Sequence, residues 1–143
     1  MSFLEKEDGQ KSAFWDWFIG IALLALVAGF TLYYQYQKRA TQARFSAADT
    51  LFRAGDFAGA SSAYETLKDA SYLTAANDST IYARLDTIGE MEERSRETVA
   101  RARMRLAAGD IEGAKTEVAS VTQPALLDAH DRAWLDSAKS ALQ

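Results

Sequence analysis

One long apolar stretch near the N-terminus constrains this chain more than any other feature. No charged residue lies between Trp17 and Tyr36, and the segment from Phe14 to Tyr34 reads FWDWFIGIALLALVAGFTLYY. A helix rises about 1.5 Å per residue, so about twenty residues span the roughly 30 Å hydrocarbon core of a bilayer. The run is too long and too evenly apolar for a buried helix of so small a chain, and it predicts a transmembrane helix over residues 14–36.

Aromatic residues crowd both ends of this stretch, where rings with a polar edge prefer the two headgroup interfaces. The stretch ends in TLYYQYQKR and lacks the small residues that mark a signal-peptide cleavage site, so we expect a permanent anchor. The aromatic residues are Phe14, Trp15, Trp17 and Phe18 at the first end, and Tyr33, Tyr34 and Tyr36 at the second.

Positive charges flank the anchor unequally. Lys6 and Lys11 precede it within a short N-terminal tail, residues 1–13, whereas Lys38, Arg39, Arg44 and Arg53 follow it. Because Lys and Arg near the ends of a membrane helix favour the cytoplasmic side, we expect a translocated tail and a cytoplasmic C-terminal part. A periplasmic C-terminal part is the alternative, and the expected location is the cytoplasmic (inner) membrane of a bacterium.

One face of the anchor carries small side chains. Ala22, Ala25 and Gly29 recur at helical spacing, and small residues let two membrane helices approach closely. An Ala- and Leu-rich composition alone would produce such a face. The sharper interpretation is that it packs on a partner's transmembrane helix.

Residues 37–143 are expected to form one all-α domain, since no segment shows the strict alternation of a surface strand. Asn77, Asp78 and Ser79 offer caps for the third helix, and Thr122 offers a cap for the last, with Pro124 in its first turn. The anchor helix is expected to continue into the first of these helices. The expected helices cover about residues 41–54, 57–70, 79–108, 111–121 and 124–142.

The sequence A-G-D-[FI]-x-G-A occurs twice, at residues 54–60 and 108–114. Each copy predicts a turn between two antiparallel helices. Gly55 and Gly109 would end one helix in a left-handed conformation, and Asp56 and Asp110 would cap the next. The apolar residue that follows, Phe57 or Ile111, is expected to pack back into the helix pair.

This pattern resembles the tetratricopeptide repeat family, in which a small residue of the first helix faces an alanine of the second. The resemblance implies a small α-solenoid of helical hairpins that holds other proteins, with the last helix as a cap. The two glycines are 54 residues apart instead of the regular period of about 34 residues, which implies an interrupted array. The matching residues are Ala48, Leu51, Phe52, Gly55, Phe57, Ala60 and Tyr64 in the first copy, and Ala102, Leu106, Gly109, Ile111, Ala114 and Val118 in the second, where Arg105 replaces the usual apolar residue.

The composition offers little to catalysis or nucleic-acid binding. The net charge is −4, the chain has no cysteine, and its single histidine, His130, is expected to be a partly buried structural residue. No phosphate-binding loop or set of metal ligands stands at a suitable spacing. We therefore expect no enzyme activity, cofactor, metal, small-molecule substrate or nucleic acid.

Two groups of residues are candidates for partner contact. Arg94, Arg101 and Arg105 share one helical face. Glutamates four residues before Arg94, Arg96 and Arg101 favour instead a solvated helix with internal ion pairs. Tyr72 and Tyr82 lie beside the irregular stretch between the two copies.

These features favour a non-catalytic accessory or structural subunit of a multi-subunit membrane complex, for example a respiratory or photosynthetic assembly. Its anchor and helical domain would contact other subunits, and the anchor would contact lipid. The alternative is a membrane-tethered chaperone or assembly adaptor of a translocon or secretion machinery.

Overall fold

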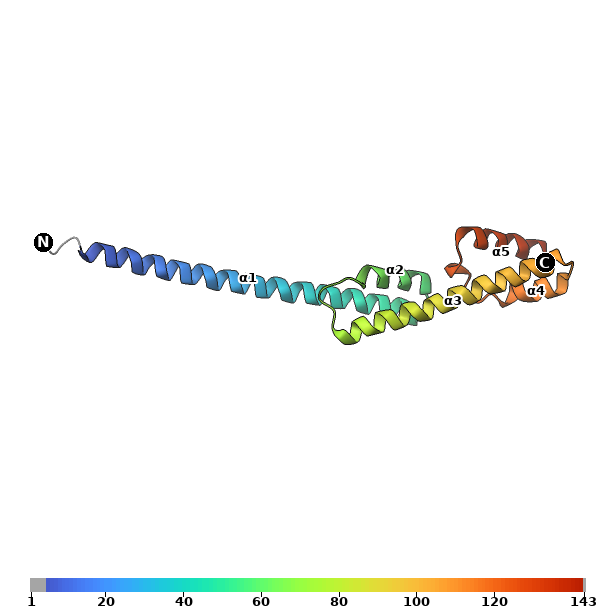
Figure 1. The fold of residues 1–143 in the computed structure, drawn as a ribbon, viewed down its shortest axis with the longest axis horizontal. Helices are drawn as coiled ribbons and strands as arrows, with labels where there is room; N and C mark the ends of the chain where they lie inside the picture. The colour runs from blue at the N-terminus through green and yellow to red at the C-terminus, as the bar shows by residue number, and fades with distance from the viewer. Residues whose placement is uncertain (1–4, 143) are drawn as a thin grey trace. The chain divides into compact units, whose positions relative to one another are not determined.

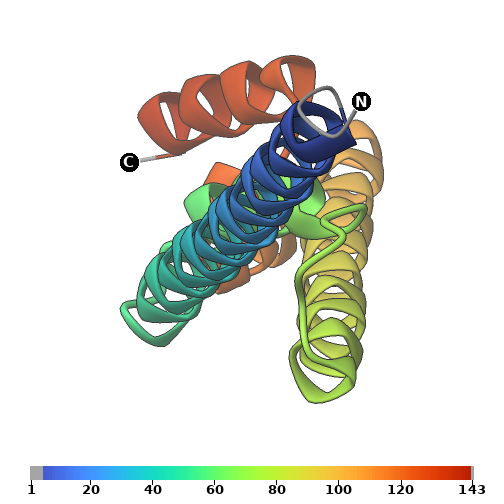
Figure 2. The ribbon, with the colours of Figure 1, turned by 90° about the vertical axis from the view of Figure 1, so that its left-hand side faces the viewer.

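The computed structural model describes the backbone of residues 5–142 and the side chains of residues 14–142. Throughout this part the chain forms helices joined by turns, with no strand, so the prediction of an all-α fold is confirmed (Figures 1 and 2). The backbone divides into a first unit that ends at Ala40 and a second that begins at Thr41. The helices are α1 (Glu5–Arg53), α2 (Phe57–Leu67), α3 (Ala75–Ala107), α4 (Ile111–Ser120), the 3-10 helix η1 (Pro124–Leu126) and α5 (Ala129–Ala141).

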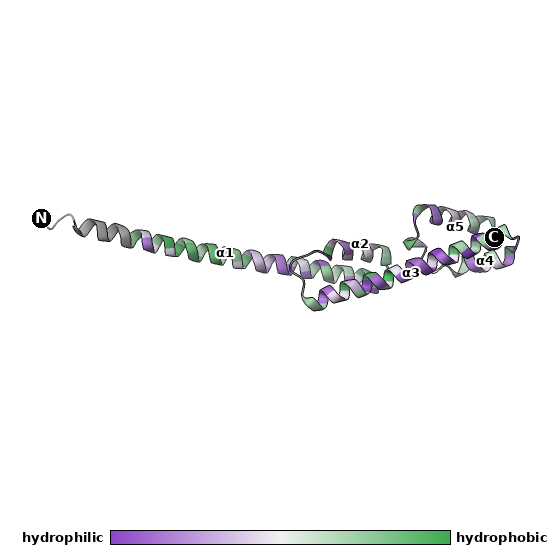
Figure 3. Cartoon of the chain, in the orientation of Figure 1, coloured by the Kyte–Doolittle hydropathy of each residue, from purple (hydrophilic) through white to green (hydrophobic). Residues whose placement is uncertain are grey.

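Helix α1 carries the apolar stretch and continues without a break into the first helix of the second unit, as expected. Figure 3 shows the stretch as a hydrophobic band along the helix. The Thr31 hydroxyl within it donates a hydrogen bond to the Val27 carbonyl at 2.8 Å, so this polar group is satisfied by the helix itself. Of the predicted tail, residues 5–13 belong to the same helix, and residues 1–4 lie outside the described part.

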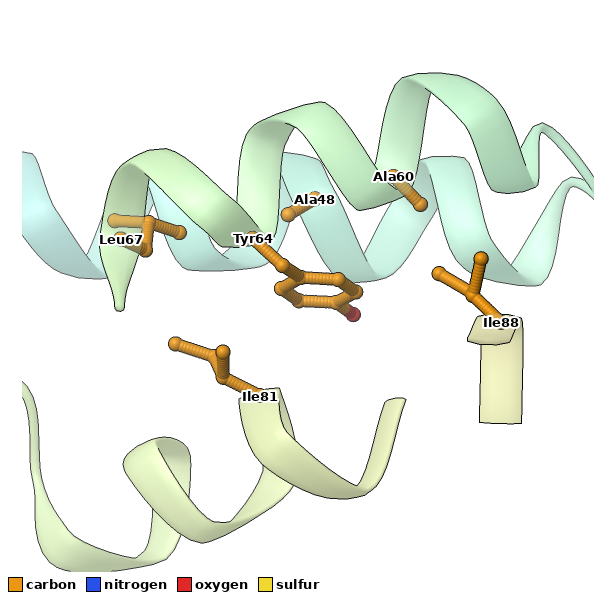
Figure 4. Close-up of a cluster of buried hydrophobic side chains, with 6 residues drawn as sticks. All are labelled: Ala48, Ala60, Tyr64, Leu67, Ile81 and Ile88. Atoms are coloured by element: carbon orange, nitrogen blue, oxygen red, sulfur yellow. The ribbon is translucent and has the colours of Figure 1, made fainter. Parts of the chain in front are cut away.

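The second unit contains two hydrophobic cores, and the first joins α1, α2 and α3 (Figure 4). Ala48 of α1 and Ala60 of α2 are fully buried where these two helices face each other. Small side chains here let the helix axes approach closely, so larger neighbours can fill the space around them. The core residues are Ala48, Ala60, Tyr64, Leu67, Ile81 and Ile88.

The second core joins the C-terminal half of α3 to α4 and α5. Helix α3 has 33 residues, long enough to supply Ile81 and Ile88 to the first core and Val99 and Ala102 to the second. This core consists of Val99, Ala102, Val118, Leu127, Leu135 and Ala138.

The two cores repeat each other at a distance of 54 residues. The N-cap residues repeat with the same shift, because Thr74 caps α3 and Asp128 caps α5, each accepting a hydrogen bond from the backbone N–H three residues later. A motif of three helices therefore occurs twice within the second unit, and α3 is both the last helix of the first motif and the first helix of the second. The buried residues at equivalent positions, 54 residues apart, are Thr41 and Ser95, Ala48 and Ala102, Ala60 and Ala114, Tyr64 and Val118, and Ile81 and Leu135.

Two predicted helix starts are wrong. The cap of α3 is Thr74, not Asn77, Asp78 or Ser79, so the helix begins four residues earlier than residue 79. The last segment is not one helix from Pro124, because Leu127 is extended (φ −68°, ψ 149°) and separates η1 from α5. Leu127 is only 2% exposed, and burying its side chain in the second core breaks the helix that Pro124 starts.

Candidate interaction surfaces

The apolar stretch of α1 is the largest exposed hydrophobic surface in the described part of the chain. Its most apolar window is wholly unburied, and this helix is long and apolar enough to cross a membrane. Ala22, Ala25 and Gly29 all lie exposed on it. A Cβ built on Gly29 would meet no atom within 4 Å, so the fold of this chain itself does not require glycine there.

The two turns have the local structure that their sequence predicts. Gly55 has φ 82° and Gly109 has φ 77°, a left-handed region that strongly favours glycine. The carboxylate of Asp56 accepts a hydrogen bond from the Gly59 N–H at 2.9 Å, and that of Asp110 accepts one from Gly113 at the same distance.

The second glycine of each turn, Gly59 or Gly113, is also required by the local structure. A Cβ on Gly59 would lie 2.5 Å from Oδ2 of Asp56, and a Cβ on Gly113 would clash with Asp110 in the same way. Any larger residue would displace the capping carboxylate. The hydrogen bond from Gly113 and then the one from Arg105 hold the pKa of Asp110 below its usual range, so this cap stays ionised at a lower pH than an ordinary aspartate does.

Only one of the two residues expected to pack back into its hairpin does so. Phe57 packs against the first core, with its ring edge-on to Phe52 at 5.2 Å between centroids. Ile111 is 57% exposed, so the prediction for Ile111 is wrong. Leu106, which stands at the position equivalent to Phe52, is itself 39% exposed, and Arg105 beside it pairs with Asp110 at 2.8 Å.

The arginines of the predicted basic face are all engaged in ion pairs. Arg94 pairs with Glu90 at 3.1 Å, and Arg101 lies 3.9 Å from Glu97 and 3.3 Å from Glu117. Arg105 lies 3.4 Å from Glu117 in addition to its contact with Asp110. These pairs neutralise much of the positive charge of this face.

The two candidate tyrosines lie on different elements of the first half of the domain. Tyr82, on α3, is 49% exposed, and the Lys68 ammonium lies 6.0 Å from the centre of its ring. Tyr72 lies in the segment between α2 and α3 and is partly buried. Tyr82 shares α3 with the three arginines and stands twelve residues before Arg94.

Two arginines of α3 that the sequence analysis did not single out hold neighbouring helices. The Arg84 guanidinium lies 4.1 Å from the Phe52 ring and 3.7 Å from Asp49, both on α1. Arg103 makes the same pair of contacts with α5, and in both cases the acid and the aromatic residue stand three apart, as D-x-x-F and D-x-x-W. That spacing places the acid and the aromatic ring on one helical face, and it is the sequence signal from which these two arginine sites could have been found. The Arg103 partners are Trp134 at 4.9 Å and Asp131 at 2.8 Å.

His130 is exposed, so its expected partial burial is wrong. It stands in the first turn of α5, beside the N-cap Asp128, where the helix faces solvent. Among the residues that the structure describes, no group of three or more His, Cys, Asp or Glu side chains could hold a metal ion.

Two open hollows lie on the second half of the domain. One, of about 140 Å³, is polar and lies between α3 and the end of α4. The other, of about 170 Å³, lies between α4 and α5 and is mainly apolar. The polar hollow is lined by Arg94, Ser95, Thr98, Ser120, Val121 and Thr122, and the apolar hollow by Lys115, Val118, Ala119, Lys139 and Leu142.

Comparison with protein-family models, with curated proteins and with solved structures gave no significant match to this chain.

Proposed function

We propose that this chain is a non-catalytic, single-pass membrane subunit that contacts other members of a membrane protein complex through its anchor and its tetratricopeptide-like domain. The observation that carries the proposal is the exposed apolar stretch of α1, on a helix whose C-terminal part contributes Ala48 to the first hydrophobic core. Water does not tolerate so large an apolar surface on a folded protein, whereas lipid and a neighbouring membrane helix both cover it favourably.

The two hairpin turns support the comparison with tetratricopeptide repeats. In each hairpin an alanine of the first helix and an alanine of the second are completely buried: Ala48 with Ala60, and Ala102 with Ala114. The repeat of 54 residues, with α3 shared between two three-helix motifs, differs from the period of about 34 residues in a regular array. The proposed domain is therefore a short, modified solenoid whose surfaces hold partner proteins.

Lys38, Arg39 and Arg44 follow the apolar stretch and favour a cytoplasmic domain in a bacterial cytoplasmic membrane. The alternative, a tethered chaperone or assembly adaptor of a secretion machinery, needs a periplasmic domain. Because the chain has no cysteine, a single cysteine placed at Ser2 or Ser140 reports its side of the membrane without background. Labelling of Ser140→Cys by a membrane-impermeant maleimide in intact cells would favour the alternative.

The small face of the anchor gives a direct test of partner contact. Gly29→Leu should greatly reduce the amount of partner that co-purifies with the full chain in mild detergent, because the leucine keeps two helices apart. Gly20→Leu is the matched control. Gly20 stands nine residues earlier, on the opposite side of a helix that turns about 100° per residue.

Mass spectrometry of the purified material would identify the partner and its stoichiometry. Fixed stoichiometry with one complex supports a subunit, and a changing set of substoichiometric clients supports the adaptor. Co-purification that Gly29→Leu and Gly20→Leu leave equally intact would contradict the proposed contact of the small face.

A further inference from the structure

The hollow between α4 and α5 combines an apolar lining with two unpaired cations. Lys115 of α4 and Lys139 of α5 both line it, and both are exposed. Within residues 14–142 neither ammonium group has an ion pair or a hydrogen bond. All six arginines of α3, in contrast, have a carboxylate partner. The two lysines at the hollow are therefore available to an external carboxylate, whereas the arginines of α3 are already paired.

The first half of the domain shows how the equivalent surface is covered. With the shift of 54 residues, Leu142 corresponds to Ile88 and Val118 to Tyr64. In the first half, η1 lies against α2 and α3, and Leu126 packs on the core that contains Ile88 and Tyr64. An apolar side chain from a separate segment thus covers the first α2–α3 surface. No described segment covers the hollow between α4 and α5 in this way.

The size of the hollow limits what it accepts. Pockets for small-molecule ligands usually measure about 300–1,000 Å³, whereas this hollow has about 170 Å³ and is open. One apolar side chain of a longer segment fits this space better than a cofactor does. The two lysines at its edge would then face charges on the same segment.

We propose that the α4–α5 hollow docks an acidic amphipathic segment of a partner protein, with an apolar side chain in the hollow and carboxylates facing Lys115 and Lys139. The proposal rests on the proposed role in a membrane complex and names the chemistry of the partner. Complementary charge at the edge of an apolar contact fixes the register of the segment and speeds its association.

Peptide binding to the full chain in neutral detergent micelles tests this. The probe is a short blocked peptide with two leucines one helical turn apart, flanked by glutamates, and its matched peptide has lysines in place of the glutamates. Fluorescence anisotropy should show tighter binding of the glutamate peptide. Lys115→Glu combined with Lys139→Glu should weaken that binding by about tenfold or more, since both attractions become repulsions.

Two further variants keep the test decisive. Ala119→Trp fills the exposed hollow without a change of charge and should abolish binding, so it decides the matter if the double variant unfolds. Lys68→Glu reverses an exposed lysine outside the hollow and should leave the affinity unchanged.

Equal affinity for the two peptides, no binding of the glutamate peptide, or unchanged binding by the double variant and Ala119→Trp would overturn the proposal. Concentration-dependent self-association that the double variant abolishes would place a second copy in the hollow instead. If the full chain keeps its membrane partner but does not bind the peptide, the docking proposal fails and the proposed function stands.

Discussion

At the scale of single residues, Tyr64 links the helices of the first core. Its ring is fully buried and lies 6.3 Å from the Phe45 ring, and its hydroxyl lies 3.4 Å from Oδ1 of Asp49. Burial, and then the charge of Asp49, raise the pKa of Tyr64 above its ordinary value of 10.0. On raising the pH, the phenol of the unfolded chain therefore ionises first. The stability that depends on this shift is complete below about pH 10 and is lost as the pH rises through the folded pKa.

We expect the free energy of unfolding of the wild-type chain to fall more steeply above about pH 10 than that of Tyr64→Phe, which keeps the ring and removes the ionisable group. Chemical denaturation in detergent micelles at a series of alkaline pH values measures this slope. Tyr82→Phe, at a half-exposed tyrosine, is the control and should keep the wild-type slope. Parallel curves for the wild type and Tyr64→Phe would contradict the role assigned to Tyr64.

At the scale of the helices and turns, replacing glycine by alanine should have opposite effects on stability at two positions. Gly55 has φ 82°, so Gly55→Ala should lower the free energy of unfolding by about 1–2 kcal/mol. Gly89 lies exposed within α3, and a Cβ there meets no atom within 4 Å. Gly89→Ala should therefore raise the free energy of unfolding by about 0.5–1 kcal/mol. Denaturant titrations of both variants test this, and effects of the same sign would show that backbone conformation is not the cause.

The turns were predictable because their determinants are local. Gly55, Asp56 and Gly59 fix a left-handed end, a cap and the room for that cap within five consecutive positions. The break between η1 and α5 was not predictable, since it depends on the burial of Leu127 among residues distant in sequence, although Asp128 offered a local cap for α5. Arg103 and Trp134 could be recognised only once α3 and α5 were known to meet. Residues with distant partners are thus the ones that the sequence alone left open.

At the scale of the whole molecule, the shared helix α3 connects the two cores of the second unit. Ile88 is the last α3 residue in the first core, and Val99 is the first in the second. Between them, α3 has many charged side chains and few buried ones. The helical backbone between these cores is therefore the main connection through which one core stabilises the other, together with Leu126 of η1.

Interrupting α3 between the cores should separate their unfolding. Glu93 is exposed and has no hydrogen bond or ion pair among the described residues, so Glu93→Pro removes no side-chain contact. The proline instead removes a backbone hydrogen bond and kinks the helix, at a cost of about 3 kcal/mol or more. We expect thermal unfolding, followed by circular dichroism in detergent micelles, to change from one transition to two. Glu93→Ala, which keeps the helix, should retain the single transition. A single transition at a lower temperature in Glu93→Pro would instead show that the two cores unfold together without an intact α3.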